Sequence, residues 1–195
     1  RDRPPDLELA VSVNLSGRQI AEPDLVDTIQ EVLEETGLQA GSLKLELTET
    51  LLMHHYEKAI HTMHELRDMG VKLSIDDFGT GYSSLSHLHR FPIDYLKVDR
   101  SFVGRVGADA RESEIVRVIV GLGRNLGMKV IAEGIETREQ VGFLRHLECD
   151  YGQGYYFARP LDAQAATDLL PHPVEPVESE EGILLVPRTD KKPPG

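Results

Sequence analysis

Short apolar segments recur along the chain, and each ends at a polar or charged residue. Apolar runs or alternations over roughly four to eight positions predict strands. The predicted strands cover residues 9–15, 43–49, 71–75, 95–99, 129–133 and 149–157. Apolar residues at helical spacing predict helices over residues 24–36, 56–68, 83–88, 112–126, a segment that starts at 137, and 162–170. A strand therefore alternates with a helix along most of the chain.

This alternation predicts a parallel sheet, either an open doubly wound sheet or a (β/α)8 barrel. The six predicted strands end at or near Asn14, Glu46, Asp76, Lys97, Glu133 and Gln153. An open sheet usually gathers its ligand groups at one switch point, whereas a barrel directs all its strand ends toward one centre. We therefore predict an α/β fold of the TIM-type barrel kind. Six strands are too few for it, so we expect the first strand–helix units to precede Arg1.

The stretch at residues 74–85 is the most distinctive, because a strand ends there in two adjacent carboxylates, Asp76 and Asp77. A loop with two glycines and two serines follows. Asp and Gly are common in turns, so this stretch alone is equally compatible with a simple turn. Side chains alternate along a strand, so adjacent carboxylates at its end diverge or straddle its tip. That arrangement suits metal ions better than it suits packing.

The strand ends together form an acidic, oxygen-rich set without Cys or His. Hard oxygen ligands favour Mg²⁺ or Mn²⁺ over Zn²⁺. Crowded carboxylates repel one another unless cations hold them, and two divalent ions about 3.5–4 Å apart would do so. Such a pair activates a water and stabilises the leaving oxygen of a phosphodiester. Lys97 can neutralise charge that develops on the phosphate or orient the attacking water.

Composition limits the class of protein. The 195 residues, of which 40% are hydrophobic, fit one domain with a sizeable core, and no apolar stretch is long enough to span a membrane. The net charge of −12 argues against broad binding of DNA or RNA. It still allows a small anionic substrate, since a metal ion can invert the local field. The single cysteine, Cys149, fits a reducing compartment.

Both ends of the chain differ from its middle. The chain has no initiator Met and opens on charged residues and prolines, so we expect it to be an excerpt from a longer protein. Residues 1–171 are predicted to form the domain. Residues 172–195, rich in proline and glutamate, are predicted to be a disordered or loosely attached tail. The apolar island at 182–186 is predicted to dock on the domain's own surface or, alternatively, to bind a partner.

Six sequence blocks, in order from about Leu9 to Leu170, resemble the EAL-domain family of bacterial cyclic-di-GMP phosphodiesterases. The blocks are Asn-Leu-Ser at 14–16, Glu-Leu-Thr-Glu at 46–49, Asp-Asp-Phe-Gly-Thr-Gly-Tyr-Ser-Ser-Leu at 76–85, Leu-Lys-Val-Asp-Arg-Ser-Phe at 96–102, Glu-Gly-Ile-Glu at 133–136 and Gln-Gly-Tyr at 153–155. Six blocks in the right order are far more specific than one short motif.

The resemblance implies a TIM-type barrel that hydrolyses cyclic di-GMP to linear pGpG with Mg²⁺ or Mn²⁺. The metal ligands that it implies are Asn14, Glu46, Asp76, Asp77 and Glu133. The catalytic residues that it implies are Lys97, which would hold the attacking water, together with Asp77, Glu133 and Glu136. Gln153 and Asp99 are implied to contact the substrate. Glu49 is implied to anchor the mobile loop at 78–85, which in the family couples metal binding to dimerisation.

One departure from the family pattern matters. The Glu-Ala-Leu segment that names the family is absent from this sequence. In the family it lies on a strand before the Asn14 strand and supplies a metal ligand, so we expect little or no hydrolysis by these 195 residues alone. Two alternatives stay open: a catalytically inactive cyclic-di-GMP receptor and a protein-interaction module. The resemblance also implies a homodimer in the bacterial cytoplasm, with an upstream GGDEF or sensory domain in the longer protein.

Overall fold

The structure is a computed structural model that describes residues 9–54, 56–81, 88–107, 110–162, 164–166 and 184–185. Its strands form one parallel sheet, and their order in the sheet follows their order in the chain. The strands are β1 (Val11–Asn14), β2 (Leu43–Thr48), β3 (Lys72–Phe78), β4 (Tyr95–Val98), β5 (Lys129–Ala132), β6 (Tyr151–Gly152) and β7 (Leu184–Leu185).

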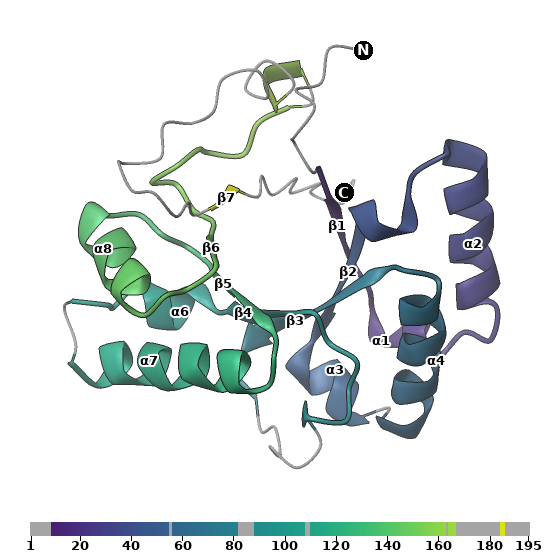
Figure 1. The fold of residues 1–195 in the computed structure, drawn as a ribbon, viewed down its shortest axis with the longest axis horizontal. Helices are drawn as coiled ribbons and strands as arrows, with labels where there is room; N and C mark the ends of the chain where they lie inside the picture. Colours follow the sequence, from purple (N-terminus) through teal and green to yellow (C-terminus); the bar gives the residue numbers. More distant parts are fainter. Residues whose placement is uncertain are drawn as a thin grey trace.

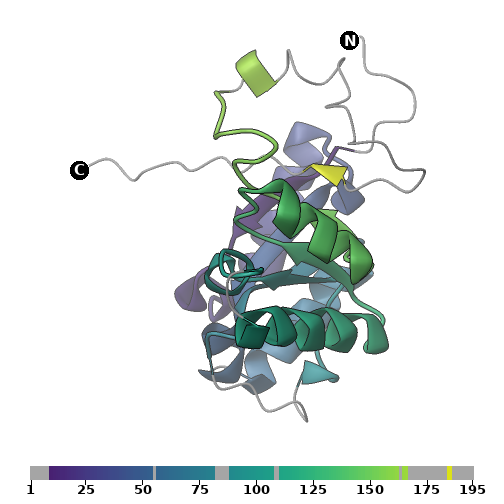
Figure 2. The same ribbon diagram turned by 90° about the vertical axis from the view of Figure 1, so that its left-hand side faces the viewer.

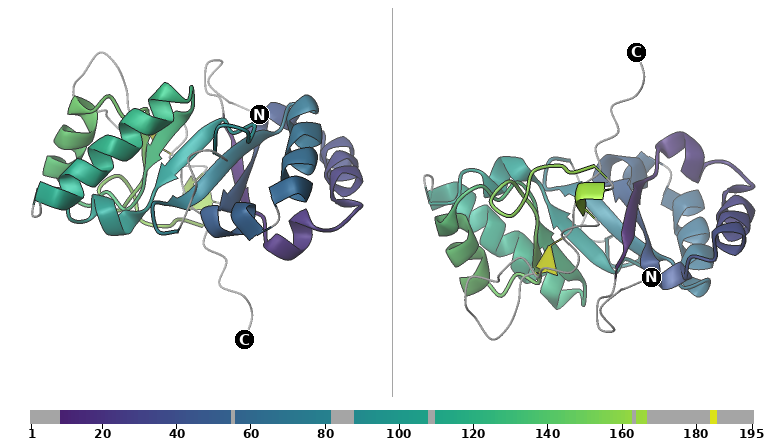
Figure 3. Two further views of the ribbon diagram at one scale, coloured as in Figure 1. Left: turned by 90° about the horizontal axis from the view of Figure 1, so that it is seen from below. Right: turned by 90° about the horizontal axis from the view of Figure 1, so that it is seen from above.

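The sheet curves into an arc, and the main helices lie on its outer, convex side (Figure 1). The described helices are α1 (Gly17–Ile20), α2 (Leu25–Thr36), the 3-10 helix η1 (Ala40–Ser42), α3 (Glu49–His54), α4 (Tyr56–Asp68), α6 (Arg100–Val103), α7 (Ala110–Asn125) and α8 (Arg138–His146). Helices α2 and α4 flank the half of the sheet that holds β1–β3, and α7 and α8 flank the half that holds β4–β6 (Figures 1 and 3). The architecture is an incomplete TIM-type barrel, as predicted. Figure 2 shows it from the side of α7 and α8.

The hydrophobic core lies between the convex face of the sheet and the helices. Alternation along β2 sends Leu45 and Leu47 into this core, where they are almost fully buried. Burial of each such side chain contributes about 1.5–3 kcal/mol. Lys44 and Glu46 alternate with them and lie on the concave face, which is the inside of the barrel. The two faces of one strand thus supply the core and the site.

Helix boundaries follow signals that are readable in the sequence. A capping box opens α8, which was predicted to start at 137: the Thr137 hydroxyl accepts a hydrogen bond from the Gln140 N–H, and the Gln140 side chain accepts one from the Thr137 N–H. Helix α2 ends at Gly37, which has a φ of 66°. Glycine at this position closes the helix without a steric penalty from a Cβ.

Strands β2 and β4 each end one residue earlier than predicted, and each is followed directly by a helix. Strand β2 ends at Thr48, and Glu49 begins α3 instead of closing the strand. Strand β4 ends at Val98, and Asp99 caps α6 by accepting a hydrogen bond from the Ser101 N–H at 2.9 Å. The predictions missed both helices because their few residues show no helical period.

The last predicted strand, at residues 149–157, is also too long. Only Tyr151 and Gly152 form β6, because the chain turns after Gln153. The Phe157 N–H donates a hydrogen bond to the Gly154 carbonyl within that turn. Residues 164–166 are helical, within the helix predicted at 162–170. The helix predicted at 83–88 lies almost wholly outside the described residues.

Part of the predicted tail joins the sheet. Leu184 and Leu185, from the apolar island at 182–186, form β7 and pair in parallel with β6. This pairing matches the predicted docking of the island on the domain's own surface. The rest of residues 172–195 lies outside the described residues. Within the described part of the chain, no helix is long and apolar enough to cross a membrane.

Candidate metal centre

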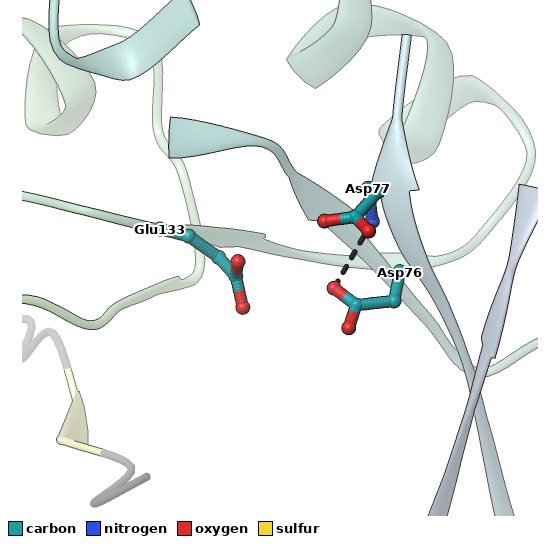
Figure 4. A group of neighbouring side chains, drawn as sticks. All are labelled: Asp76, Asp77 and Glu133. Carbon is teal, nitrogen blue, oxygen red and sulfur yellow. Dashed lines mark hydrogen bonds between the residues drawn. The ribbon is translucent and has the colours of Figure 1, made fainter. Parts of the chain in front are cut away.

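The two adjacent carboxylates at the end of β3 are brought to one side by an irregular backbone. The pairing of β3 with β4 shifts register between Ile75 and Phe78. Asp77 has a φ of 54°, which interrupts the strand's alternation. The Asp77 N–H donates a hydrogen bond to the Asp76 carboxylate at 3.0 Å (Figure 4). Both side chains therefore face the same space, although adjacent strand residues normally diverge.

Glu133 completes a group of three carboxylates. It follows β5 directly, and its N–H donates a hydrogen bond to the Val98 carbonyl of the neighbouring strand. One oxygen each from Asp76, Asp77 and Glu133 lie within 4.8 Å of one another. Figure 4 shows these side chains converging from two strand ends. Asp76 and Glu133 are buried, so their charges require compensation nearby.

Lys97 supplies that compensation. Its Nζ lies 2.7 Å from Glu46 Oε2, 2.9 Å from Asp76 Oδ1 and 2.6 Å from Glu133 Oε1. The lysine side chain is 2% exposed. Burial alone would lower the pKa of Lys97, but the three carboxylates outweigh it and raise the pKa above that of free lysine. The side chain is therefore a protonated ammonium ion at neutral pH.

The neighbouring strands place two further predicted ligands in this layer. Glu46 is buried on β2 and contacts Lys97 directly. Asn14 ends β1 and lies opposite Glu46 in the strand register. Residues opposite each other on parallel strands face the same side of the sheet, so Asn14 lies beside the carboxylate group.

The glycine loop after Asp77 is held from α3. The Glu49 carboxylate is buried and accepts a hydrogen bond from the Gly79 N–H at 2.9 Å. Gly79 has a φ of 99°, and a Cβ at this position would lie 2.9 Å from a ring carbon of Phe102. Glycine is required here for both conformation and space. Residues 82–85 of the predicted mobile loop lie outside the described residues.

The other predicted residues lie directly after β6, shortly before α8 and directly after β4. The Gln153 N–H donates a hydrogen bond to the Ala132 carbonyl, which places Gln153 beside the end of β5. Glu136 is exposed just before α8. Asp99 is half-buried, and its carboxylate accepts hydrogen bonds from the N–H and hydroxyl of Ser101. Partial burial opposes ionisation of Asp99, but hydrogen bonds, chiefly from Ser101, lower its pKa overall.

Sequence reasoning missed Lys44. This lysine is buried on the same face of β2 as Glu46, with its Nζ 3.6 Å from the centre of the Tyr95 ring. Burial is the main cause that lowers the pKa of Lys44. Its position two residues before Glu46 on a predicted strand was a readable signal, because such residues share a face.

The arrangement fits a hard divalent metal ion. The converging group consists of carboxylates, two of them buried, and Mg²⁺ and Mn²⁺ prefer such oxygen ligands. Asp76, Asp77 and Glu133 are best placed to hold an ion, with Glu46 and Asn14 on the adjacent strands. Lys97 supplies a positive charge at the same point.

The protein is an incomplete TIM-type barrel. Its site consists of acidic residues and a lysine at the carboxyl ends of the parallel strands. The family model of the EAL domain matches residues 1–160. The chain belongs to the EAL domain family.

Relatives of known name support the assignment. The chain is 46% identical over 162 residues to cyclic di-GMP phosphodiesterase NbdA of Pseudomonas aeruginosa, and the match covers 83% of this chain and 21% of NbdA. It is 40% identical over 155 residues to the oxygen sensor protein DosP of Escherichia coli, covering 80% of this chain and 19% of DosP. The chain thus spans about a fifth of the length of these curated relatives.

Solved structures show the same fold. The PaMucR phosphodiesterase in complex with c-di-GMP matches with a TM-score of 0.78 and 42% identity, over 80% of this chain and 64% of that one. The manganese and cyclic-di-GMP complex of Klebsiella pneumoniae BlrP1 matches with a TM-score of 0.72 and 34% identity, over 78% of this chain and 39% of that one.

Proposed function

We propose that this chain is the catalytic part of a bacterial phosphodiesterase that hydrolyses cyclic di-GMP to linear pGpG with Mg²⁺ or Mn²⁺. The observation that carries the proposal is the convergence of Glu46, Asp76 and Glu133 on Lys97, with Asp77 alongside, at the carboxyl ends of the strands. The relatives named above add that proteins of this family include a cyclic di-GMP phosphodiesterase.

The position of each residue suggests its role in the proposed reaction. Asp76, Asp77 and Glu133 would hold the metal, with Glu46 and Asn14 as further ligands. Bound divalent ions supply Lewis-acid stabilisation of phosphodiester oxygens and a more acidic water. The Lys97 ammonium lies at the same point and would stabilise negative charge on the phosphate or orient the water.

The remaining predicted residues would bind the substrate and control access. Gln153 directly follows β6 and Asp99 directly follows β4, and both are proposed to contact the dinucleotide. Glu136 is exposed and is proposed to act on the water. Glu49 fixes the start of the glycine loop through Gly79, so it is proposed to set the position of that loop. A homodimer and an upstream GGDEF or sensory domain are part of the same proposal.

The test is an assay with cyclic di-GMP and Mn²⁺ that measures pGpG by chromatography. It compares the 195-residue chain with a longer version that carries a Glu-Ala-Leu segment. We expect turnover by the longer version and little or none by the shorter. Tight binding without turnover by the longer version would contradict the enzyme and support the receptor.

Asp76→Asn in the longer version is the sharpest variant. It keeps the volume of the side chain but removes a charged metal ligand, so we expect turnover to fall by roughly a hundredfold or more. The unfolding temperature, measured in parallel, should show that the fold persists. Activity within a factor of about two of the parent would show that Asp76 does not hold the metal.

A further inference from the structure

The Lys97 ammonium contacts three carboxylates at once. An ammonium group has three N–H donors. The three carboxylate oxygens around Nζ, from Glu46, Asp76 and Glu133, all lie within 2.9 Å of it. The ammonium is therefore in close ionic contact with all three carboxylates, and its contact with Glu46 is a hydrogen bond.

The partners of Lys97 are the same groups that are proposed to hold the metal. A divalent ion that binds Asp76 and Glu133 competes with the ammonium for their oxygens. Electrostatics favours the exchange, because a doubly charged ion compensates the carboxylates better than one ammonium does. A metal ion on these carboxylates therefore weakens their attraction for the ammonium.

We propose that Lys97 is a built-in counter-ion: it holds the carboxylates together whenever metal is absent and yields them when metal binds. Metal binding thereby releases the Lys97 ammonium from these ionic contacts, so that it can interact with a water or a phosphate oxygen. Lys97 is thus a positioning residue for the metal ligands before it is available for chemistry. The inference rests on the proposed metal site, but it does not require turnover.

The test compares two buried lysines of the sheet, Lys97 on β4 and Lys44 on β2. Lys97→Met removes the counter-ion. Lys44→Met removes a lysine that is equally buried on the concave face but whose Nζ rests on the Tyr95 ring. Unfolding temperatures are measured in EDTA and in saturating Mn²⁺, without nucleotide. Mn²⁺ affinity is measured by titration calorimetry on the same samples.

In EDTA, Lys97→Met should lower the unfolding temperature by about 10 °C, because buried carboxylates lose their partner. Mn²⁺ should restore at least half of that loss. Since the two readouts are linked in one thermodynamic cycle, Mn²⁺ should also bind the variant about tenfold more tightly than the parent. Lys44→Met should change the unfolding temperature equally in EDTA and Mn²⁺.

The counter-ion role would be overturned if Lys97→Met lowered the unfolding temperature equally in EDTA and in Mn²⁺, or did not lower it at all. Weaker Mn²⁺ binding by the variant would also overturn it. If the variant does not fold in EDTA, addition of Mn²⁺ must restore a cooperative transition; failure to do so overturns the proposal as well. The double variant E46Q/K97M, with one carboxylate fewer, should be more stable in EDTA than Lys97→Met alone. No nucleotide is used, so a chain that binds metal but does not hydrolyse cyclic di-GMP can still confirm the counter-ion role. The result is therefore independent of the proposed function.

Discussion

Asp77 has a φ of 54°, in the left-handed region that residues with a Cβ rarely occupy. Aspartate tolerates this region better than most residues because its short side chain bonds locally. The consequence at the scale of one residue is that Asp76 and Asp77 face the same space. The single Asp–Asp pair in the sequence thus combines two proposed metal ligands with a left-handed backbone conformation at Asp77.

Substitutions at Asp77 should separate these two roles. Asp77→Gly and Asp77→Ala both remove the carboxylate, so both should weaken Mn²⁺ binding to a similar extent. Asp77→Gly should be more stable than Asp77→Ala by about 1 kcal/mol, because glycine adopts positive φ without strain. Urea unfolding in EDTA measures the difference. Equal stability of the two variants would show that the backbone relaxes when the carboxylate is lost.

Cys149 gives a prediction about alkaline pH. Burial raises the pKa of its thiol from 9.0 to about 12. Above pH 9 the unfolded chain releases this proton while the folded chain keeps it, so stability falls as pH rises. The stability advantage of the parent over Cys149→Ala should shrink by about 1.4 kcal/mol between pH 7 and pH 10. A constant difference over this range would mean that the thiol ionises freely in the folded protein.

At the scale of elements, the glycine loop after β3 packs against two helices. A Cβ on Gly79 would lie 2.9 Å from Phe102 of α6 and 3.1 Å from Ile119 of α7. Glu49 of α3 holds the same residue through its N–H. Residues from three helices therefore restrict the position of Gly79, directly after β3.

Gly79→Ala and Gly127→Ala form a matched pair for this contact. Both glycines have positive φ, at 99° and 74°, so both variants carry the conformational penalty. A Cβ on Gly127 meets nothing within 4 Å, whereas one on Gly79 meets Phe102. Gly79→Ala should lose about 1–3 kcal/mol more than Gly127→Ala in urea unfolding. Equal losses would mean that Phe102 and Ile119 move aside without cost.

At the scale of the whole molecule, the sheet has an open edge at β1. Only one neighbour pairs with β1 in the described sheet, and Val11 and Val13 are exposed there, at 53% and 44%. An unpaired edge with apolar side chains promotes association with other chains.

Val13→Lys should reduce self-association, measured by light scattering, and change the free energy of unfolding by less than about 1 kcal/mol. Val118→Lys on α7 is the control, because Val118 is 61% exposed on a helix and has no free backbone edge. A larger decrease in self-association with Val118→Lys would show that the chains associate through α7 and not through β1.

The sequence by itself determined the strand–helix alternation, the residues at the strand ends and the family. Local signals were sufficient there, since side-chain period and caps such as Thr137 act within a few residues. Tertiary structure alone decided which groups meet. The three contacts of Lys97 link β4 to β2, to β3 and to the residue directly after β5. These segments are far apart in sequence, and no spacing rule predicts that one ammonium contacts three carboxylates. Likewise, the positive φ of Asp77 and the burial of Lys44 arise only when the sheet curves and its strands pair.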